Sequence, residues 1–413
     1  MASAAQQSHL NPVSPENLRD PIAVYKALRE EDPVHWEESA QAWFITRYTD
    51  VSNCFRDSRL SADRSVVYEH AMRLLGLGPS DIPDLIGTLR QQLINQDGAR
   101  HLRMRRQSNP GFTPQILDSW RPNIHRLMNQ LVDQVLPAGR MEMVKDISYQ
   151  LPPIVISELL GLPPEDRDKL REWTEPAAQL GSPMVGVDMV ELARRANAGM
   201  KALSEYLTRI VEERRNNLGD DIISLMLRAQ EQGGMAMEEL VPNISLLISA
   251  GHLTTTDQLA NGIHDLLSHP EQLQMLRDNP LLLKSALEEI IRYHPAVPFI
   301  HRLAAETFTL HGRTIRKGDI VFLGMAAANR DPSVFPEPDR FDITRDSYMQ
   351  KHIAFGFGPH HCLGAGLARR ELELGIEVML NRLPNLRLDE EHPPQVKFSS
   401  LLFRGFESLH LRF

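Results

Sequence analysis

The sequence predicts a mainly α-helical protein with a smaller β-rich part, built as one compact body of two lobes over residues 1–413. Between residues 101 and 292 the hydrophobic residues recur mostly with helical spacing. From residue 308 the pattern changes to short apolar runs that are typical of strands, and a helical pattern returns after Cys362. With 413 residues, 42% of them hydrophobic, the chain is long enough to bury a large core.

Short strands are expected in three parts of the chain, about 33–47, 296–325 and 395–413. The first part holds two apolar runs on either side of a polar turn, which predicts a hairpin. The second holds three short apolar runs separated by His311-Gly312 and Lys317-Gly318, two residue pairs that favour turns. The third is the tail, whose pattern is extended. The remainder of the chain is expected to be largely helical.

Charge and cysteine content exclude several classes of protein. The net charge of -9 argues against nucleic acid as a partner. Two cysteines are too few for a disulfide framework and favour a reducing compartment. The chain has neither a signal-peptide pattern at its start nor the run of about 18 apolar residues that a membrane span needs. We therefore expect a cytoplasmic monomer without a membrane anchor.

Cys362 lies in the glycine-rich segment FGFGPHHCLG, residues 355–364. Leucines recur at helical spacing beyond it, so a helix is expected to begin just after Cys362. The free N–H groups of that helix would point at the sulfur and lower the pKa of the thiol. The glycines let a flat group lie against the main chain. The pattern favours a thiolate ligand for the metal of a flat cofactor, and haem fits. Cys54 has no such context and is expected in the core.

The longest helix is expected over residues 242–267, about 39 Å at about 1.5 Å per residue, and should cross the core. Its middle contains Gly251 and three consecutive threonines, which weaken helix preference. Ala250 and Thr254 lie four apart and share one face. One interpretation is that the Thr254 hydroxyl donates back to the carbonyl of Ala250, as buried threonines often do. The other is that this break in the local pattern marks a functional hydroxyl.

At this point the chain resembles a soluble bacterial-type cytochrome P450 over nearly its whole length. The resemblance implies a triangular prism fold, mainly helical with a small β-rich lobe. It also implies haem b, iron protoporphyrin IX, bound between the long central helix and the helix after Cys362. Cys362 matches the position of the axial haem ligand, and Phe355, Gly358 and Gly364 match the surrounding loop.

The resemblance also implies which residues bind the two propionates of haem. His101 and Arg105 match the family's H-x-x-x-R pattern, and their spacing places both on one helix face, where they can bind an anionic edge. Arg302 lies where the family places another propionate arginine, and His360 matches a histidine two residues before the cysteine.

The family's E-x-x-R motif is matched by Glu289 and Arg292, but its spacing alone carries no information. The same spacing recurs at Glu191/Arg194, Glu212/Arg215 and Glu337/Arg340. Glu289 and Arg292 are preferred because they precede Tyr293-His294-Pro295 and the strand region in the order that the family shows. The segment around Arg340 resembles the family's later P-x-R-F element. The resemblance therefore implies a buried structural cluster of Glu289, Arg292 and Arg340.

The central helix departs from the family in one position. The family usually reads A-G-x-acid-T, and Ala250, Gly251 and Thr254 match, but Leu253 replaces the acid that helps to deliver protons. One hypothesis is a monooxygenase in which Thr254, His252, water or substrate groups supply protons. A second is oxidative cyclisation or coupling without net oxygen insertion. A third is a function outside redox catalysis, such as a haem sensor.

A structural zinc site is a further alternative, since imidazole and thiolate suit zinc. Its candidate ligands are His352, His360, His361 and Cys362.

The predicted substrate pocket is mainly apolar and rests on the resemblance. It draws on Leu253, Val297, Phe299, Ile300, Leu401 and Leu402, on residues 65–93, and on Ser182-Pro183-Met184. Such a lining favours a sizeable apolar or amphipathic substrate. We expect hydroxylation or epoxidation, with O2, of a polyketide, macrolide or peptide intermediate that a carrier protein can hold. Electrons are expected from a separate ferredoxin and ferredoxin reductase, which would dock at Arg103, Arg106 and Arg370.

Overall fold

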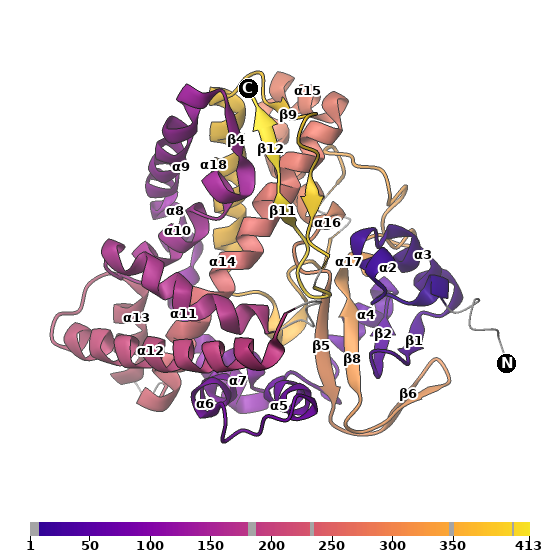
Figure 1. The fold of residues 1–413 in the computed structure, drawn as a ribbon, viewed down its shortest axis with the longest axis vertical. Helices are drawn as coiled ribbons and strands as arrows, with labels where there is room; N and C mark the ends of the chain where they lie inside the picture. Colours follow the sequence, from indigo (N-terminus) through magenta and orange to yellow (C-terminus); the bar gives the residue numbers. More distant parts are fainter. Residues whose placement is uncertain (1–7, 181–186, 232–234, 347–350, 399) are drawn as a thin grey trace.

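Helix α14 (Met237–Ser268) runs through the middle of the molecule in the computed structural model, which describes residues 8–180, 187–231, 235–346, 351–398 and 400–413 (Figure 1). It packs against α10 (Leu151–Leu159), α12 (Met189–Arg215) and α18 (Ala365–Arg382). The predicted central helix is confirmed and begins five residues earlier than expected. The Glu239 carboxylate accepts the backbone N–H of Ala236, which stabilises this earlier start.

The remaining helices follow the predicted helical pattern closely. They are α2 (Pro15–Arg19), α3 (Ile22–Glu31), α4 (Tyr48–Cys54), α5 (Ser65–Leu74), α6 (Pro83–Gln91), α7 (Gly98–Ser108), α8 (Pro114–Ser119), α9 (Arg121–Val135), α11 (Arg167–Gln179), α13 (Ile222–Glu231), α15 (Pro270–Asp278), α16 (Leu283–Tyr293) and α17 (Met325–Ala328). Helix α17 was not expected, because a single turn is too short to display helical periodicity.

The main sheet has five strands in the order β1-β2-β8-β5-β3. The strands of the structure are β1 (Val34–Glu37), β2 (Ala42–Ile45), β3 (Leu60–Ser61), β4 (Arg140–Glu142), β5 (Phe299–Ala304), β6 (Phe308–Leu310), β7 (Arg313–Ile315), β8 (Ile320–Gly324), β9 (Arg387–Leu388), β10 (Gln395–Val396), β11 (Phe406–Ser408) and β12 (His410–Arg412). The predicted first hairpin is β1-β2, with Val34 opposite Ile45. Strands β3, β4 and β9 lie outside the predicted β-rich parts, because two or three residues are too few to show alternation.

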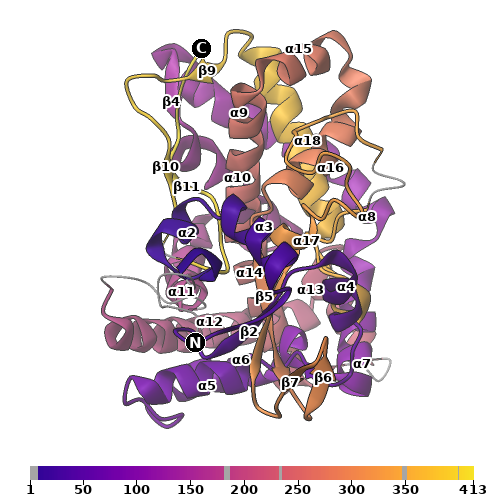
Figure 2. The same ribbon diagram turned by 90° about the vertical axis from the view of Figure 1, so that its right-hand side faces the viewer.

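The apolar core follows this division of the fold. One large cluster fills the space among the helices, and two smaller clusters cover the two faces of the main sheet. The sheet and the N-terminal helices α2 and α3 lie on one side of α14, the side that faces the viewer in Figure 2. Among the described helices, none combines the length and the apolar character that crossing a bilayer requires.

Candidate active site

The Cys362 loop is held by its own backbone. Gly356 and Gly358 adopt φ values of 71° and 73°, in the left-handed region that favours glycine. The N–H of Cys362 donates to the carbonyl of Phe355 at 2.9 Å, which closes the loop. Helix α18 begins three residues after Cys362, and the N–H groups of Gly364 and Ala365 point at its sulfur. The predicted placement of the cysteine at a helix start is confirmed.

The electrostatics of Cys362 differ from the sequence prediction. Burial raises the pKa of its thiol, while the amide of Gly364 and the guanidinium groups of Arg105 and Arg369 lower it. Burial is the larger effect, so the predicted net lowering of the pKa is wrong. Cys362 has accessible surface although the surrounding protein raises the pKa of its thiol, so we interpret that surface as lining an inward-facing recess. Cys54 is a core residue, as predicted, and burial raises its pKa to about 12.

The middle of α14 has accessible residues between two buried stretches. Residues 243–248 and 255–263 are fully buried, whereas Ala250 is exposed and Leu253 and Thr254 are partly accessible. The Thr254 hydroxyl donates to the carbonyl of Ala250 at 3.0 Å, so the back-bonding interpretation holds for this residue. The hydroxyl proton is used in that hydrogen bond, but the oxygen can still accept a hydrogen bond from another donor.

His252 does not share this face. Two residues correspond to about 200° around a helix, so His252 points away from the side that carries Thr254. It is 4% exposed, and its ring centroid lies 4.7 Å from that of Tyr149. Burial lowers its pKa to about 4. The prediction of His252 as a proton relay beside Thr254 is therefore wrong. Gly251 faces Ile156 of α10, where it allows close helix packing.

Four predicted propionate partners come together near the Cys362 loop. The rings of His101 and His360 lie 3.9 Å apart, and Arg105 and Arg302 are close enough to affect the pKa of His101. Burial and these like charges lower the pKa of His101 to about 4, and burial followed by Arg64 lowers that of Arg302 to about 9. Such buried cations require anions.

The described residues supply too little negative charge for this cluster. Asp97 lies 3.8 Å from His360, but its carboxylate also accepts bonds from Ser61 and from the N–H of Ala62. Nε2 of His101 has no partner among the described residues, and Arg302 donates to the carbonyl of His301 at 3.0 Å. A Cβ on Gly364 would meet no heavy atom within 4 Å. These features fit a flat group with two carboxylates placed over Cys362.

The family model for cytochrome P450 matches residues 82–404, which include the Cys362 loop, α14 and the cluster of cations. The chain belongs to the cytochrome P450 family. It is thus a cytochrome P450 monooxygenase with a haem-thiolate cofactor. This result also confirms the predicted fold class, the mainly helical triangular prism of the family with its small sheets.

Three relatives place this P450 among bacterial members. It is 35% identical to cytochrome P450 CYP107DY1 of Priestia megaterium, covering 97% of this chain and 98% of that protein. It is 33% identical to the polyketide biosynthesis cytochrome P450 PksS of Bacillus subtilis, covering 97% of each. The crystal structure of P450BioI, in complex with an acyl carrier protein ligated to hexadec-9Z-enoic acid, superposes with a TM-score of 0.87 at 32% identity, covering 97% of this chain and 100% of that one.

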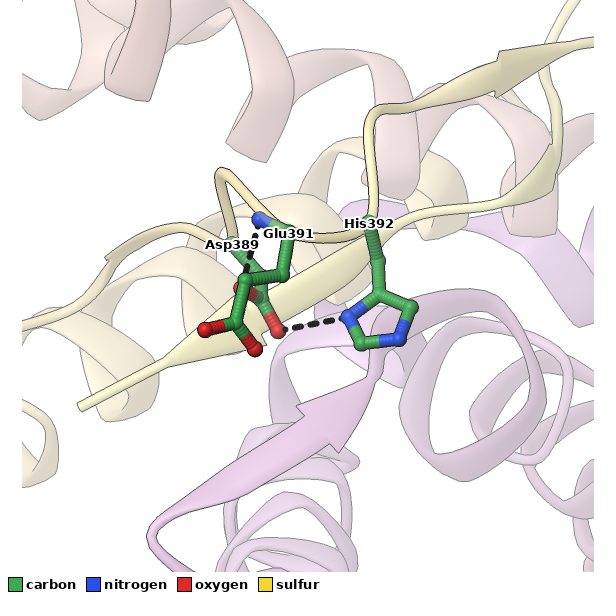
Figure 3. Close-up of side chains that lie close together, drawn as sticks. All are labelled: Asp389, Glu391 and His392. Atoms are coloured by element: carbon green, nitrogen blue, oxygen red, sulfur yellow. Dashed lines mark hydrogen bonds and ion pairs between the residues drawn. The ribbon is translucent and has the colours of Figure 1, made fainter.

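Two residues of the alternative zinc site, His352 and His360, have other partners. His352 bonds to Glu288 at 3.0 Å, and Glu288 also binds Arg369. Within the described ranges, the group of ligand atoms close enough for a metal is Asp389, Glu391 and His392 instead (Figure 3). Arg412 forms ion pairs with both of those carboxylates, so their charge is already offset.

The buried ion pair of the P450 has the predicted centre but a different third member. Arg292 binds Glu289 at 2.7 Å, with both side chains no more than 2% exposed. The predicted role of the Arg340 side chain is wrong: it is 58% exposed and pairs with Glu337, while only its carbonyl accepts from Arg292. Arg345 fills the buried position, with Nε 3.2 Å from Glu289. No family motif had singled out Arg345.

Arg292 also connects this ion pair to the Cys362 loop. It donates to the carbonyl of Asn329 at 2.8 Å. The side-chain oxygen of Asn329 accepts the N–H of Ile353 at 2.8 Å, two residues before Phe355. One fully buried asparagine therefore joins the ion pair to the segment that leads into the loop.

The predicted pocket residues separate into two groups. Leu253, Val297, Ile300 and Leu402 are partly accessible. Phe299 is fully buried, with its ring packed edge-on against Tyr25 and Phe44, and Leu401 belongs to the same core cluster. Phe299 alternates with Ile300 along β5, so the two side chains face opposite sides of the sheet. The prediction of Phe299 as a pocket residue is therefore wrong. Ser182-Pro183-Met184 lies outside the described residues.

A surface groove of about 760 Å³ lies beside the Cys362 side of α18. It is lined by the cations Arg121, Lys284, Lys351, Arg369 and Arg370 and by the acids Asp118, Glu288 and Glu373. Arg370 lies in it, as the docking hypothesis requires, and pairs with Asp118 at 2.7 Å. Arg103 instead binds Glu239 at 2.8 Å, so its charge is already offset, and Arg106 is exposed on α7.

Proposed function

We propose that this P450 binds haem b through Cys362 and uses O2 to hydroxylate or epoxidise a sizeable apolar or amphipathic biosynthetic intermediate. The observation that carries the proposal is Cys362, held at the start of α18 by the glycine loop and placed near the cluster of buried cations. The intermediate is a polyketide, macrolide or peptide, held on a carrier protein. Both cysteines are free thiols, which is consistent with a cytoplasmic enzyme.

Each residue of the site has a role in this function. The Cys362 sulfur coordinates the iron, and His101, Arg105, Arg302 and His360 bind the propionates. Haem with a thiolate ligand supplies the activation of O2 when it is bound. Oγ1 of Thr254 can accept a hydrogen bond from water or substrate while its own proton is donated to the Ala250 carbonyl. Leu253 has no titratable proton, so the protons that the reaction consumes would come from water or from the substrate.

Support for the substrate class comes from the pocket and from the relatives. The partly accessible residues Leu253, Val297, Ile300 and Leu402 are all aliphatic, which suits an apolar substrate. PksS is named for polyketide biosynthesis, and P450BioI is described with a fatty acyl group on a carrier protein. The absence of an acid at Leu253 favours one second candidate, oxidative cyclisation or coupling, because that reaction needs less protonation.

Product analysis under ¹⁸O2 tests this function. The purified P450 is supplied with ferredoxin, ferredoxin reductase and a panel of polyketide and acyl substrates, free and on a carrier protein. We expect substrate binding to shift the haem absorption and the product to contain one labelled oxygen atom. An unlabelled, dehydrogenated or cyclised product would instead establish the second candidate, and haem without turnover on the panel would favour a sensor.

Leu253→Glu in the same assay tests the missing acid. A carboxyl group at this partly accessible position supplies a proton beside Thr254, so we expect more product for each reductant consumed. Leu253→Gln is the matched control, since it has similar shape and polarity but no titratable proton, and it should show no gain. If Leu253→Glu loses activity without any gain in coupling, the hypothesis of an impaired proton route in a hydroxylase is wrong.

We also propose that the groove beside α18 is where the electron donor docks. An acidic ferredoxin would meet Lys284 and Lys351, and it would compete with Glu373, Glu288 and Asp118 for the arginines that these acids pair with, Arg121, Arg369 and Arg370. Arg370→Glu is expected to slow haem reduction about tenfold at low salt, with the difference shrinking as salt rises. The control is Arg209→Glu on α12, an exposed arginine that is also paired with an acid but lies outside the groove. Equal reduction rates and salt dependence in both variants would contradict this docking site.

A further inference from the structure

We infer that Arg64 and Tyr68 form a carboxylate-binding site on the inner side of α5, additional to His101, Arg105, Arg302 and His360. The inference rests on the proposed haem site. Arg64 immediately precedes α5, and the N–H of Tyr68 donates to its carbonyl at 3.0 Å. The two side chains are four residues apart and therefore share one helix face.

That face points into the protein. Arg64 and Tyr68 are partly accessible, but Nε of Arg64 is buried. The ring centroid of Tyr68 lies 6.5 Å from that of His301, in an edge-on arrangement. His301 is 4% exposed and immediately precedes Arg302 in β5. Arg302 faces the other side of the strand from His301, but the charge of Arg64 is close enough to lower the pKa values of Arg302 and His360, which links the site to the cation cluster described above.

The charge on Arg64 lacks a bonded acid. Its guanidinium donates to the carbonyl of Ile94 at 3.2 Å, and its Nε has no partner among the described residues. Asp63 is adjacent in sequence and its charge partly offsets that of Arg64, but its Oδ1 accepts both the N–H and the hydroxyl of Ser65. Nε2 of His301 is likewise without a partner in the described part of the chain.

The positive charge of Arg64 makes the charged form of Arg302 less stable unless an anion is nearby. Burial lowers the pKa of Arg64, and the charges of Arg64 and Arg302 disfavour each other. Two buried guanidinium groups in this position are stable only when negative charge compensates them. A carboxylate is the best match, because the planar guanidinium binds it with two parallel hydrogen bonds and the phenol of Tyr68 can donate a third.

Two carboxylates can reach this site: a haem propionate, or the acid end of a fatty-acyl substrate. Haem transfer to apomyoglobin tests the first. If the anion is a propionate, Arg64→Met should speed haem loss about tenfold, because one charge-assisted contact is removed. Arg64→Lys should have a smaller effect, because it keeps the charge. Arg73→Met is the matched control, an arginine on α5 that is 66% exposed and pairs with Glu69.

The second arm compares palmitic acid with hexadecanol, using the shift of the haem absorption on binding. For a substrate carboxylate, Arg64→Met should weaken palmitic acid about tenfold, leave hexadecanol unchanged, and leave haem transfer at the rate of the native protein. Tyr68→Phe removes only the hydroxyl and should change the same measurement as Arg64→Met, either haem transfer or palmitic acid binding. It therefore tests the site even if Arg64→Met does not fold.

Unchanged haem transfer and unchanged binding of both ligands in Arg64→Lys and Tyr68→Phe would overturn the inference. That result leaves the proposed function intact, because the native protein would still hold haem. A native protein that holds no haem would refute the proposed function itself, independently of any variant.

Discussion

Replacing Cys362 by serine is expected to abolish the absorption spectrum of thiolate-bound haem, whereas replacing Cys54 leaves that spectrum intact. Cys362 has accessible surface that faces inward at the start of α18, with two backbone N–H groups directed at its sulfur. A serine hydroxyl at this position is far less acidic than a thiol and supplies no thiolate to the iron. The measurement is the carbon monoxide difference spectrum of the reduced protein, with iron and haem content measured in parallel.

Cys54 provides the matched control because it is the other cysteine of the chain. It is 5% exposed and packs in the core cluster on one face of the sheet. Cys54→Ser therefore costs some stability, about 1–3 kcal/mol for a buried hydroxyl without a partner, but it does not touch the iron. Cys54→Ala avoids that cost. A carbon monoxide spectrum in Cys362→Ser identical to that of the native protein would refute the assignment of the axial ligand.

Replacing Glu289 by glutamine is expected to destabilise the fold by about 3–5 kcal/mol, because it leaves the buried Arg292 without its counter-charge and weakens the contact with Arg345. The Glu289 carboxylate also accepts the backbone N–H of Asp342 at 2.8 Å, so several contacts depend on it. The measurement is the urea midpoint and the melting temperature, with haem content determined for each sample.

The chain contains its own control for this experiment. Glu337 and Arg340 have the same E-x-x-R spacing, but their side chains are 74% and 58% exposed. Glu337→Gln should change stability by no more than about 1 kcal/mol, since exposed ion pairs contribute little. Equal destabilisation by Glu289→Gln and Glu337→Gln would show that burial of the ion pair does not stabilise this fold.

Sequence patterns predicted the parts of this protein that depend on local repetition. The long helix over α14, the hairpin β1-β2 and the glycine-rich turn before α18 all have local signals of this kind. His101 and Arg105 also needed no structure to be paired, since one helix turn separates them. The resemblance to cytochrome P450 then linked these distant segments.

The errors concern the side of an element that a residue faces. His252 lies within an expected functional motif, yet helix geometry turns it toward Tyr149. Phe299 lies next to Ile300, yet the strand turns it into the core. Arg345 replaced Arg340 because the loop between them turns back toward Glu289, which no periodicity reports. The pKa of Cys362 was mispredicted because burial is a property of the whole fold.

The contact between Asn329 and Ile353 limits the order in which this enzyme can fold during its synthesis. The ion pair of Glu289 and Arg292 can form before the ribosome has made Cys362, but Asn329 cannot fasten the cysteine loop until Ile353 has emerged. Haem capture must wait for α18, close to the C-terminus. A chain that ended before this helix would contain most of the fold but would lack the Ala365 N–H group that faces the Cys362 sulfur.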